Sequence, residues 1–333
     1  MQKIKSNRLM LVQYRKAKEI TMKFVGVNTI FSLFFVLILN SCKEDVQKKV
    51  VLIDETSKQN PSLFTLPKVP SKIIFCGEQI DLTDEDVREK LDREILVNAY
   101  FQSATVLSLK RSKRYFPQIE KIFKEEKVPE DLKYLTVIES GLSQAVSPVG
   151  AQGFWQFMPF TAKEFDLEIS TEVDERLHIE KSTRAACQYL KKANASLNDW
   201  LLTAASYNRG VAGVRSDMNW QGTDHYFDTD MNSETGRYVY RLLAVKLLFE
   251  NPELYGYDIN KMEVYQPFKT VNIRIKKSIP SISKWALSRG FNFKIITKLN
   301  PWLKGNRLTI RKKHYTLLIP HSSQNLKPYK KYL

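Results

Sequence analysis

An acidic residue surrounded by apolar residues is the strongest chemical signal in this sequence. Glu139 lies in the run 137–141 (Val-Ile-Glu-Ser-Gly), and a stretch of aromatic and amide residues follows at 153–159. Apolar neighbours disfavour a carboxylate anion, so the pKa of the carboxyl group rises towards the value that a general acid needs at neutral pH. The pattern therefore predicts a protonated acid beside a sugar-binding groove.

Helices are expected to hold this acid in place. A helix that starts at 129–131 (Pro-Glu-Asp) and ends near Gly141 puts Glu139 at a C-terminal end, where the helix dipole further disfavours an anion. Residues 84–255 show no alternating strand pattern, so we expect an all-α domain. Further helices are predicted at 87–100, 115–126, 160–165, 179–197, 199–207 and 235–249. The polar, aromatic stretch 220–232 is interpreted as an active-site loop.

The last part of the chain differs from this helical domain in pattern and in charge. Two strands and two helices are predicted in the order βααβ, at 270–276, 279–289, 293–299 and 314–320. Residues 265–333 carry 16 Lys and Arg and no Asp or Glu, whereas residues 42–264 carry 29 Lys and Arg and 35 acids. We therefore expect a separate basic module with a polyanionic or surface partner of its own.

The beginning of the sequence is typical of a lipoprotein signal. Residues 24–39 are uncharged and apolar, Lys23 precedes them, and Cys42 closes the segment. Sixteen such residues fall short of the about 20 that a membrane helix needs. We expect a signal peptide at 1–41, started at either Met1 or Met22, and a lipid anchor on Cys42. An uncleaved anchor helix is the alternative.

These features predict the order of domains and the location of the protein. A tether at 43–80 is followed by the helical domain at 81–264 and by the basic module at 265–333. The predicted location is the outer membrane, with the chain facing the periplasm or exposed on the surface. Export argues against a nucleic-acid partner, although a basic tail with Tyr and Trp would otherwise suggest one.

Cysteine and histidine residues are sparse. Cys76 and Cys187 are left after lipidation, and either one disulfide or two separate thiols would fit them. The four His residues are scattered, and no Cys/His spacing is typical of a metal site. We expect no metal and no other cofactor.

A series of short motifs resembles one enzyme family. The matching pieces, in order, are Glu139-Ser140, 145–153, 155–159, 173–176 (Val-Asp-Glu-Arg), 182–186, Asp199-Trp200, 204–210 (Ala-Ala-Ser-Tyr-Asn-Arg-Gly) and Glu234-Thr235 with Tyr238-Val239. On these residues, roughly 84–255 resembles the lytic transglycosylases of glycoside hydrolase family 23 (SLT domain), most closely the membrane-bound lytic murein transglycosylase D group. The tail resembles a divergent LysM domain.

The resemblance implies a lysozyme-like helical fold and a reaction on peptidoglycan. Glu139 would protonate the oxygen between N-acetylmuramic acid and N-acetylglucosamine and would then act as base towards the C6 hydroxyl, giving a 1,6-anhydro product. The motifs supply one carboxylate in the cleft, which suits a substrate-assisted route. In Val-Asp-Glu-Arg, Arg176 is expected to pair with a carboxylate and to have a structural role.

Polar and apolar groups around this acid are predicted to bind the sugars. The expected contacts are Ser147, Gln156, Met158, Tyr207, Asn208 and Glu234. Tyr207 is also expected to hydrogen-bond Glu139, and Trp155 to contact a sugar or to pack in the core. Ser147 lies one residue nearer to Glu139 than is usual in the family, and Glu234 also suits a helix start.

Two other functions remain open at this point. One is a hydrolase of the same fold, as in goose-type lysozymes, and the other is a non-catalytic peptidoglycan-binding scaffold. The LysM-like module would bind N-acetylglucosamine chains or only pack against the catalytic domain. The expected partners are glycan strands and the membrane, and a monomer is expected.

Overall fold

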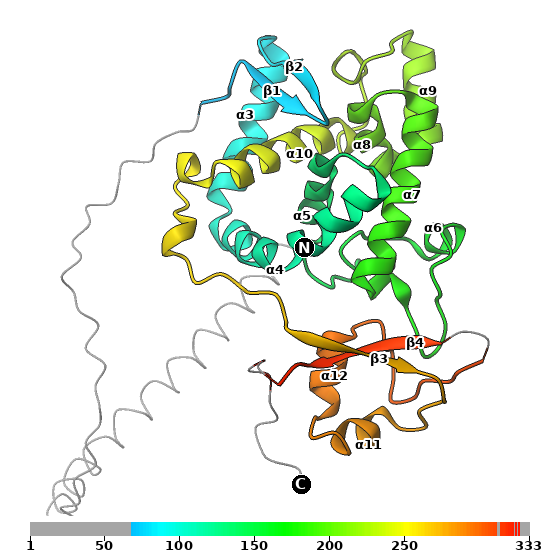
Figure 1. Cartoon of the computed structure of the whole chain (residues 1–333). Coiled ribbons are helices and arrows are strands. Elements are labelled where there is room, and N and C mark those ends of the chain that lie inside the picture. Colours follow the sequence, from blue (N-terminus) through cyan, green and yellow to red (C-terminus); the bar gives the residue numbers. More distant parts are fainter. Residues whose placement is uncertain (1–67, 312–313, 323, 325, 327–333) are drawn as a thin grey trace, which may run out of the picture. The chain divides into compact units, whose positions relative to one another are not determined.

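The computed structural model describes residues 68–311, 314–322, 324 and 326. The expected signal peptide, the lipid site at Cys42 and most of the expected tether lie outside these residues. Within them, no helix is both long and apolar enough to cross a membrane. Helices dominate the part up to residue 264 (Figure 1).

A β-hairpin opens the described part of the chain. Strands β1 (Lys72–Phe75) and β2 (Glu78–Asp81) pair antiparallel, and the left-handed residues Cys76 and Gly77 form the turn. Ile73 and Phe75 are buried in the core of the helical domain. The prediction of a tether that extends to residue 80 is therefore wrong at its end. Residues 72–80 are folded, because alternate apolar side chains of β1 pack on the core of the helical domain.

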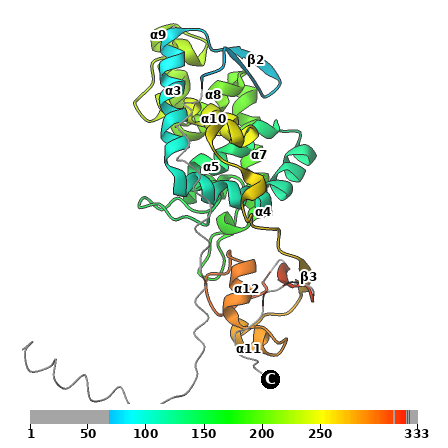
Figure 2. The same cartoon turned by 90° about the vertical axis from the view of Figure 1, so that its left-hand side faces the viewer.

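The helical domain surrounds one continuous apolar core. Its α-helices are α3 (Glu85–Tyr100), α4 (Gln102–Glu126), α5 (Leu135–Ser140), α6 (Pro159–Glu164), α7 (Ile179–Leu197), α8 (Trp200–Arg209), α9 (Val211–Gln221) and α10 (Thr235–Glu250). Short 3₁₀ turns lie at Glu130–Tyr134, Glu175–Leu177, Tyr226–Asp228, Pro252–Tyr255 and Ile259–Lys261. The core includes Leu91, Phe123, Leu132, Trp155 and Leu243, all with side chains less than 2% exposed. Helix α10 packs along α3 (Figure 2).

One helix is longer than the sequence predicts, and another was not predicted. Helix α4 begins at Gln102 rather than near Tyr115. The sequence does not indicate this first part, because small polar residues such as Ser108 and Ser112 occupy buried positions there. Ser112 satisfies its own hydroxyl by donating to the Leu109 carbonyl. Helix α9 was not predicted; it precedes the stretch 220–232 interpreted as a loop, overlaps only its first two residues, and buries only Val214 and Asp217.

The C-terminal module has the predicted βααβ order. Strands β3 (Thr270–Ile275) and β4 (Tyr315–Pro320) pair antiparallel, with helices α11 (Ile282–Leu287) and α12 (Phe293–Leu299) between them. A second apolar cluster fills it, including Ile282, Ile296, Trp302 and Leu317. The predicted mainly α chain with a small α/β appendage is thus confirmed.

Candidate active site

Glu139 lies in the last turn of α5, and its carboxyl group is half-buried. Gly141 ends the helix in the left-handed conformation, with φ 58°. The side chain of Tyr238, on α10, donates a hydrogen bond to Glu139 Oε1. Two helices far apart in the sequence therefore meet at this carboxyl group.

The surroundings of Glu139 keep its proton near neutral pH. Burial raises its pKa from 4.5 to about 7, against the hydrogen bond from Tyr238, which favours the ionised form. The charge of Glu234 raises this pKa further, and Arg241 lowers it. The carboxyl group can therefore donate a proton at neutral pH and hold a negative charge afterwards.

The tyrosine that contacts Glu139 is not the predicted one. Tyr207 donates instead to the backbone carbonyl of Trp155, at 2.8 Å. The predicted hydrogen bond from Tyr207 to Glu139 is therefore wrong, because the sequence does not reveal that α10 passes closer to Glu139 than α8 does. Tyr238 stood among the matched motifs without an assigned role, and its position one helical turn after Glu234 was the available signal.

A cleft of about 500 Å³ contains four of the predicted sugar-binding residues. They are Gln156, Met158, Tyr207 and Asn208. Met158 is 41% exposed, and its apolar side chain is therefore available to contact the face of a sugar ring. Glu139 is not part of this lining. Burial raises the pKa of Tyr207, and the charge of Glu139 raises it further.

Asn208 and Glu234 are joined at the border of this cleft. Asn208 Nδ2 donates to Glu234 Oε1 at 3.1 Å, and the Thr235 hydroxyl donates to Asn208 Oδ1 at 2.7 Å. These bonds tie the end of α8 to the start of α10. The exposed carboxyl group of Glu234 is thus bound to Asn208, and its negative charge also raises the pKa of Glu139.

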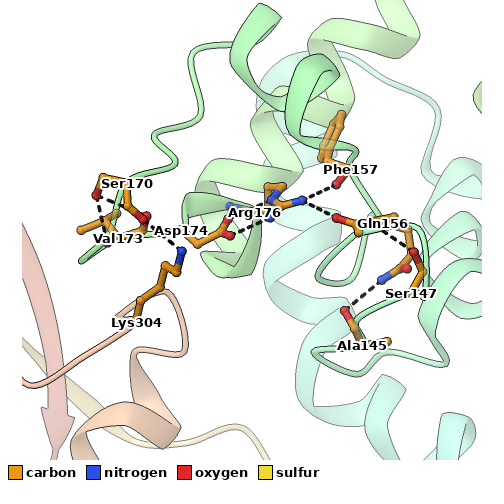
Figure 3. Close-up of polar contacts among 11 residues, drawn as sticks. Ala145, Ser147, Gln156, Phe157, Ser170, Val173, Asp174, Arg176 and Lys304 are labelled. Atoms are coloured by element: carbon orange, nitrogen blue, oxygen red, sulfur yellow. Dashed lines mark hydrogen bonds and ion pairs between the residues drawn. The ribbon is translucent and has the colours of Figure 1, made fainter.

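Residues 145–157 form a folded loop, here called the cleft loop. Ser147 Oγ accepts from the amide of Ala151 at 2.9 Å, and Gln156 Nε2 donates to the carbonyls of Ala145 (3.1 Å) and Gly153 (2.8 Å). Ser147 is not in the cleft lining, whereas Gln156 is. Both side chains thus shape the loop (Figure 3).

Arg176 is hydrogen-bonded to the backbone of the cleft loop (Figure 3). Its guanidinium pairs with Asp174 through two bonds, at 2.9 and 2.7 Å, and both side chains are buried. Nη1 also donates to the carbonyls of Gly150 at 2.7 Å and Phe157 at 3.1 Å. The predicted pairing of Arg176 with a carboxylate, and its structural role, are therefore confirmed.

Comparison with known proteins gives the same assignment for two segments. Residues 117–228 match the family model described as Transglycosylase SLT domain, and residues 271–323 match the Soluble lytic transglycosylase C-terminal LysM-like domain. Residues 117–228 are thus similar to an SLT domain, and the helical part of the chain that contains them is called the SLT domain below. The helical, lysozyme-like fold class expected from the motifs is thereby confirmed.

Several known proteins resemble the chain over a larger part of its length. Membrane-bound lytic murein transglycosylase D from two strains of Escherichia coli is 23% identical over 253 residues, which cover 73% of this chain. The chain spans about half the length, 54%, of these curated relatives. An inactive mutant of lytic transglycosylase Slt from Pseudomonas aeruginosa is 19% identical over 54% of this chain and 33% of its own, with a TM-score of 0.35.

Other expectations within or beside the SLT domain are also decided by the geometry. Trp155 is fully buried, and its indole donates to the hydroxyl of Thr183 at 3.0 Å, so it belongs to the core. No residue of 220–232, the expected active-site loop, lines the cleft described above. Cys76 and Cys187 are separate thiols, and burial raises the pKa of Cys187 to about 12.

Proposed function

We propose that this chain is an exported, lipid-anchored murein lytic transglycosylase. The substrate is the glycan strand of peptidoglycan, cut between N-acetylmuramic acid and N-acetylglucosamine. The names of the matched domains and of the relatives support this substrate class. The observation that carries the proposal is one half-buried carboxyl group, Glu139, with a pKa of about 7 and a tyrosine hydroxyl on it.

The chemistry needs this carboxyl group twice. Protonated Glu139 gives its proton to the glycosidic oxygen while the C1–O bond breaks, and the 2-acetamido group of the substrate stabilises the developing cation. The ionised carboxylate then removes the proton from the C6 hydroxyl, whose oxygen bonds to C1 of the same ring. No water is consumed, and the ring closure gains from proximity, so a second carboxylate is not required.

The remaining predicted residues would bind and orient the sugars. Gln156, Met158, Tyr207 and Asn208 line the cleft, and we assign the sugar contacts to them. Tyr238 would stabilise the ionised form of Glu139 by its hydrogen bond. For Ser147 and Glu234 we propose indirect roles, through the cleft loop and through Asn208.

Product analysis tests the reaction. Digested murein should yield fragments ending in 1,6-anhydro-N-acetylmuramic acid by mass spectrometry, and Glu139→Gln should abolish their release. Fragments ending in reducing N-acetylmuramic acid would instead identify a hydrolase. Equal activity of wild type and Glu139→Gln would remove Glu139 from the mechanism and favour a binding scaffold.

The location is proposed from the sequence, and the domain division from the sequence together with the hairpin that packs on the helical core. We propose that Cys42 is lipidated and holds the chain at the outer membrane, facing the periplasm. We place the catalytic domain at 72–264, including the hairpin, and the glycan-binding LysM-like module at 265–333. Cys42→Ala should move the protein from the membrane to the soluble fraction. Retention of that variant in membranes would contradict the lipid anchor.

A further inference from the structure

One segment of the SLT domain contacts both the C-terminal module and the cleft loop. Residues 168–178, here called the bridging segment, follow α6 and include the 3₁₀ turn Glu175–Leu177. Their contacts to each side are the basis of the inference. Figure 3 shows the bridging segment between Lys304 of the module and the cleft loop.

The backbone of the bridging segment is hydrogen-bonded to the module. The amide of Asp174 donates to the Trp302 carbonyl at 2.8 Å, and the amide of Lys304 donates to the Glu172 carbonyl at 2.9 Å. Between them, Val173 forms an antiparallel bridge with Leu303. The side chain of Val173 is 1% exposed and belongs to the apolar core of the module. This part of the SLT domain thus completes the module.

Side chains strengthen the same contact. Glu172 accepts from the Thr309 amide at 2.7 Å and from the Thr309 hydroxyl at 3.0 Å. Glu168 accepts from the Tyr315 hydroxyl at 2.9 Å, and Lys304 Nζ donates to the Ser170 carbonyl at 3.1 Å. Two acids therefore face a module region, 265–333, that contains 16 Lys and Arg and no acid. Charge complementarity favours this contact.

On its other side the bridging segment fixes the cleft loop. Arg176 binds the carbonyls of Gly150 and Phe157, near the two ends of the stretch that carries Gln156. Gly153 lies against the backbone of Arg176 so closely that a Cβ there would be 2.2 Å from the Arg176 carbonyl oxygen. The shape of the cleft loop therefore depends on where Arg176 is held.

We propose that the C-terminal module positions the active-site cleft through the bridging segment, in addition to any glycan that the module binds. Glu172, Val173 and Arg176 are the positioning residues. If the contact between the module and the bridging segment loosened, Val173 would leave the apolar core of the module and the Asp174 amide would lose its hydrogen bond to the Trp302 carbonyl. Arg176 would then lose its fixed position, and the loop carrying Gln156 would open more often.

Hydrogen exchange of the full-length protein tests the connection. Glu172→Ala removes the acceptor for Thr309, and Glu172→Lys adds repulsion from the basic module. Glu89→Ala, an exposed acid on α3, is the matched control. We expect the amides of Gln152 and Gly153, which are hydrogen-bonded within the loop, to exchange on the order of tenfold faster in the Glu172 variants only.

Two results would overturn the proposal. One is faster exchange at the Lys304 and Thr309 amides with unchanged exchange in the cleft loop, because the module would then move without affecting the cleft. The other is unchanged exchange in both places in both variants, because Glu172 would then carry none of the connection. Neither hydrogen-exchange result depends on whether the protein is enzymatically active.

A kinetic comparison adds a functional readout that rests on the proposed function. The substrate is a soluble murein tetrasaccharide, which lacks the long glycan strand that a recruiting module would bind. We expect Glu172→Lys to lower kcat/KM on this fragment by about tenfold, as for a few lost hydrogen bonds. A module that only recruits glycan would leave this value unchanged and lower activity on insoluble murein alone. An inactive wild type would instead refute the proposed function and leave the exchange result standing.

Discussion

Replacing Glu139 with Gln should stabilise the protein at alkaline pH and have little effect at acid pH. Gln has the shape of protonated Glu and still offers an acceptor to Tyr238, which now donates to Glu139 Oε1. It cannot ionise, so it avoids the cost of a buried negative charge. Activity and stability are therefore expected to change in opposite directions in Glu139→Gln, as for a group whose ionisation is unfavourable in the folded state.

The magnitude follows from the pKa of Glu139. Burial raises this pKa from 4.5 to about 7, and each pKa unit corresponds to about 1.4 kcal/mol, so ionisation costs the folded state about 3 kcal/mol. Below pH 4.5 the group is protonated in both the folded and unfolded states, and no cost arises. Between pH 4.5 and 7 the folded state binds more protons than the unfolded state, so wild-type stability falls as the pH rises.

Denaturant unfolding of both proteins at pH 4, 5.5, 7 and 8.5 measures this difference. The free energy of unfolding of Glu139→Gln minus that of wild type should increase from pH 4.5 to 7 and remain constant at about 3 kcal/mol above pH 7. Titration of all other groups cancels in the subtraction. A difference that does not change with pH would refute the raised pKa, and a difference of opposite slope would show that the folded state favours the anion.

Other substitutions test the remaining parts of the site. Tyr238→Phe removes the hydrogen bond that lowers the pKa of the Glu139 carboxyl group. The fall of kcat/KM at alkaline pH, expected near pH 7, should therefore move to higher pH. Tyr207→Phe is the control and should not move it, because Tyr207 donates to the Trp155 carbonyl instead. In denaturant unfolding, Gly153→Ala should lower the free energy of unfolding by about 3 kcal/mol, because its Cβ would overlap the backbone of Arg176. Gly150→Ala is the control; it has open space and only the strain of a positive φ, so it should cost about 1 kcal/mol. Arg176→Lys keeps the charge but loses the forked bonds, and calorimetry should show a lower Tm, for a loss of about 2 kcal/mol.

The sequence predicts helices well where their buried face is apolar. Helices α7 and α12 have the predicted bounds, because their apolar periodicity is clear. The first half of α4 was missed because Ser and Thr occupy buried positions there. Helix α9 was missed because it buries few side chains, so its pattern looks like that of a loop.

The site was predictable where function depends on local sequence. The apolar run around Glu139 predicts its raised pKa, and the Val-Asp-Glu-Arg motif predicts that Arg176 pairs with a carboxylate, which the structure shows to be Asp174. Contacts between distant segments were not predictable in this way. Tyr238 lies 99 residues from Glu139 in the sequence, and the link from Lys304 to Ser170 spans 134 residues. Only the packing of α10 on the core, and of the module on the bridging segment, brings these groups together.

The pair of Glu139 and Tyr238 explains how one residue could serve in both steps of the proposed reaction. Burial favours the protonated carboxyl group, which the first step uses, whereas the Tyr238 hydroxyl favours the carboxylate, which the second step uses. If burial acted alone, the anion left by the first step would be costly; if the hydrogen bond acted alone, the acid would already be ionised at neutral pH. Their opposition leaves the pKa at about 7, where a group can donate and then recover a proton with little cost in either direction.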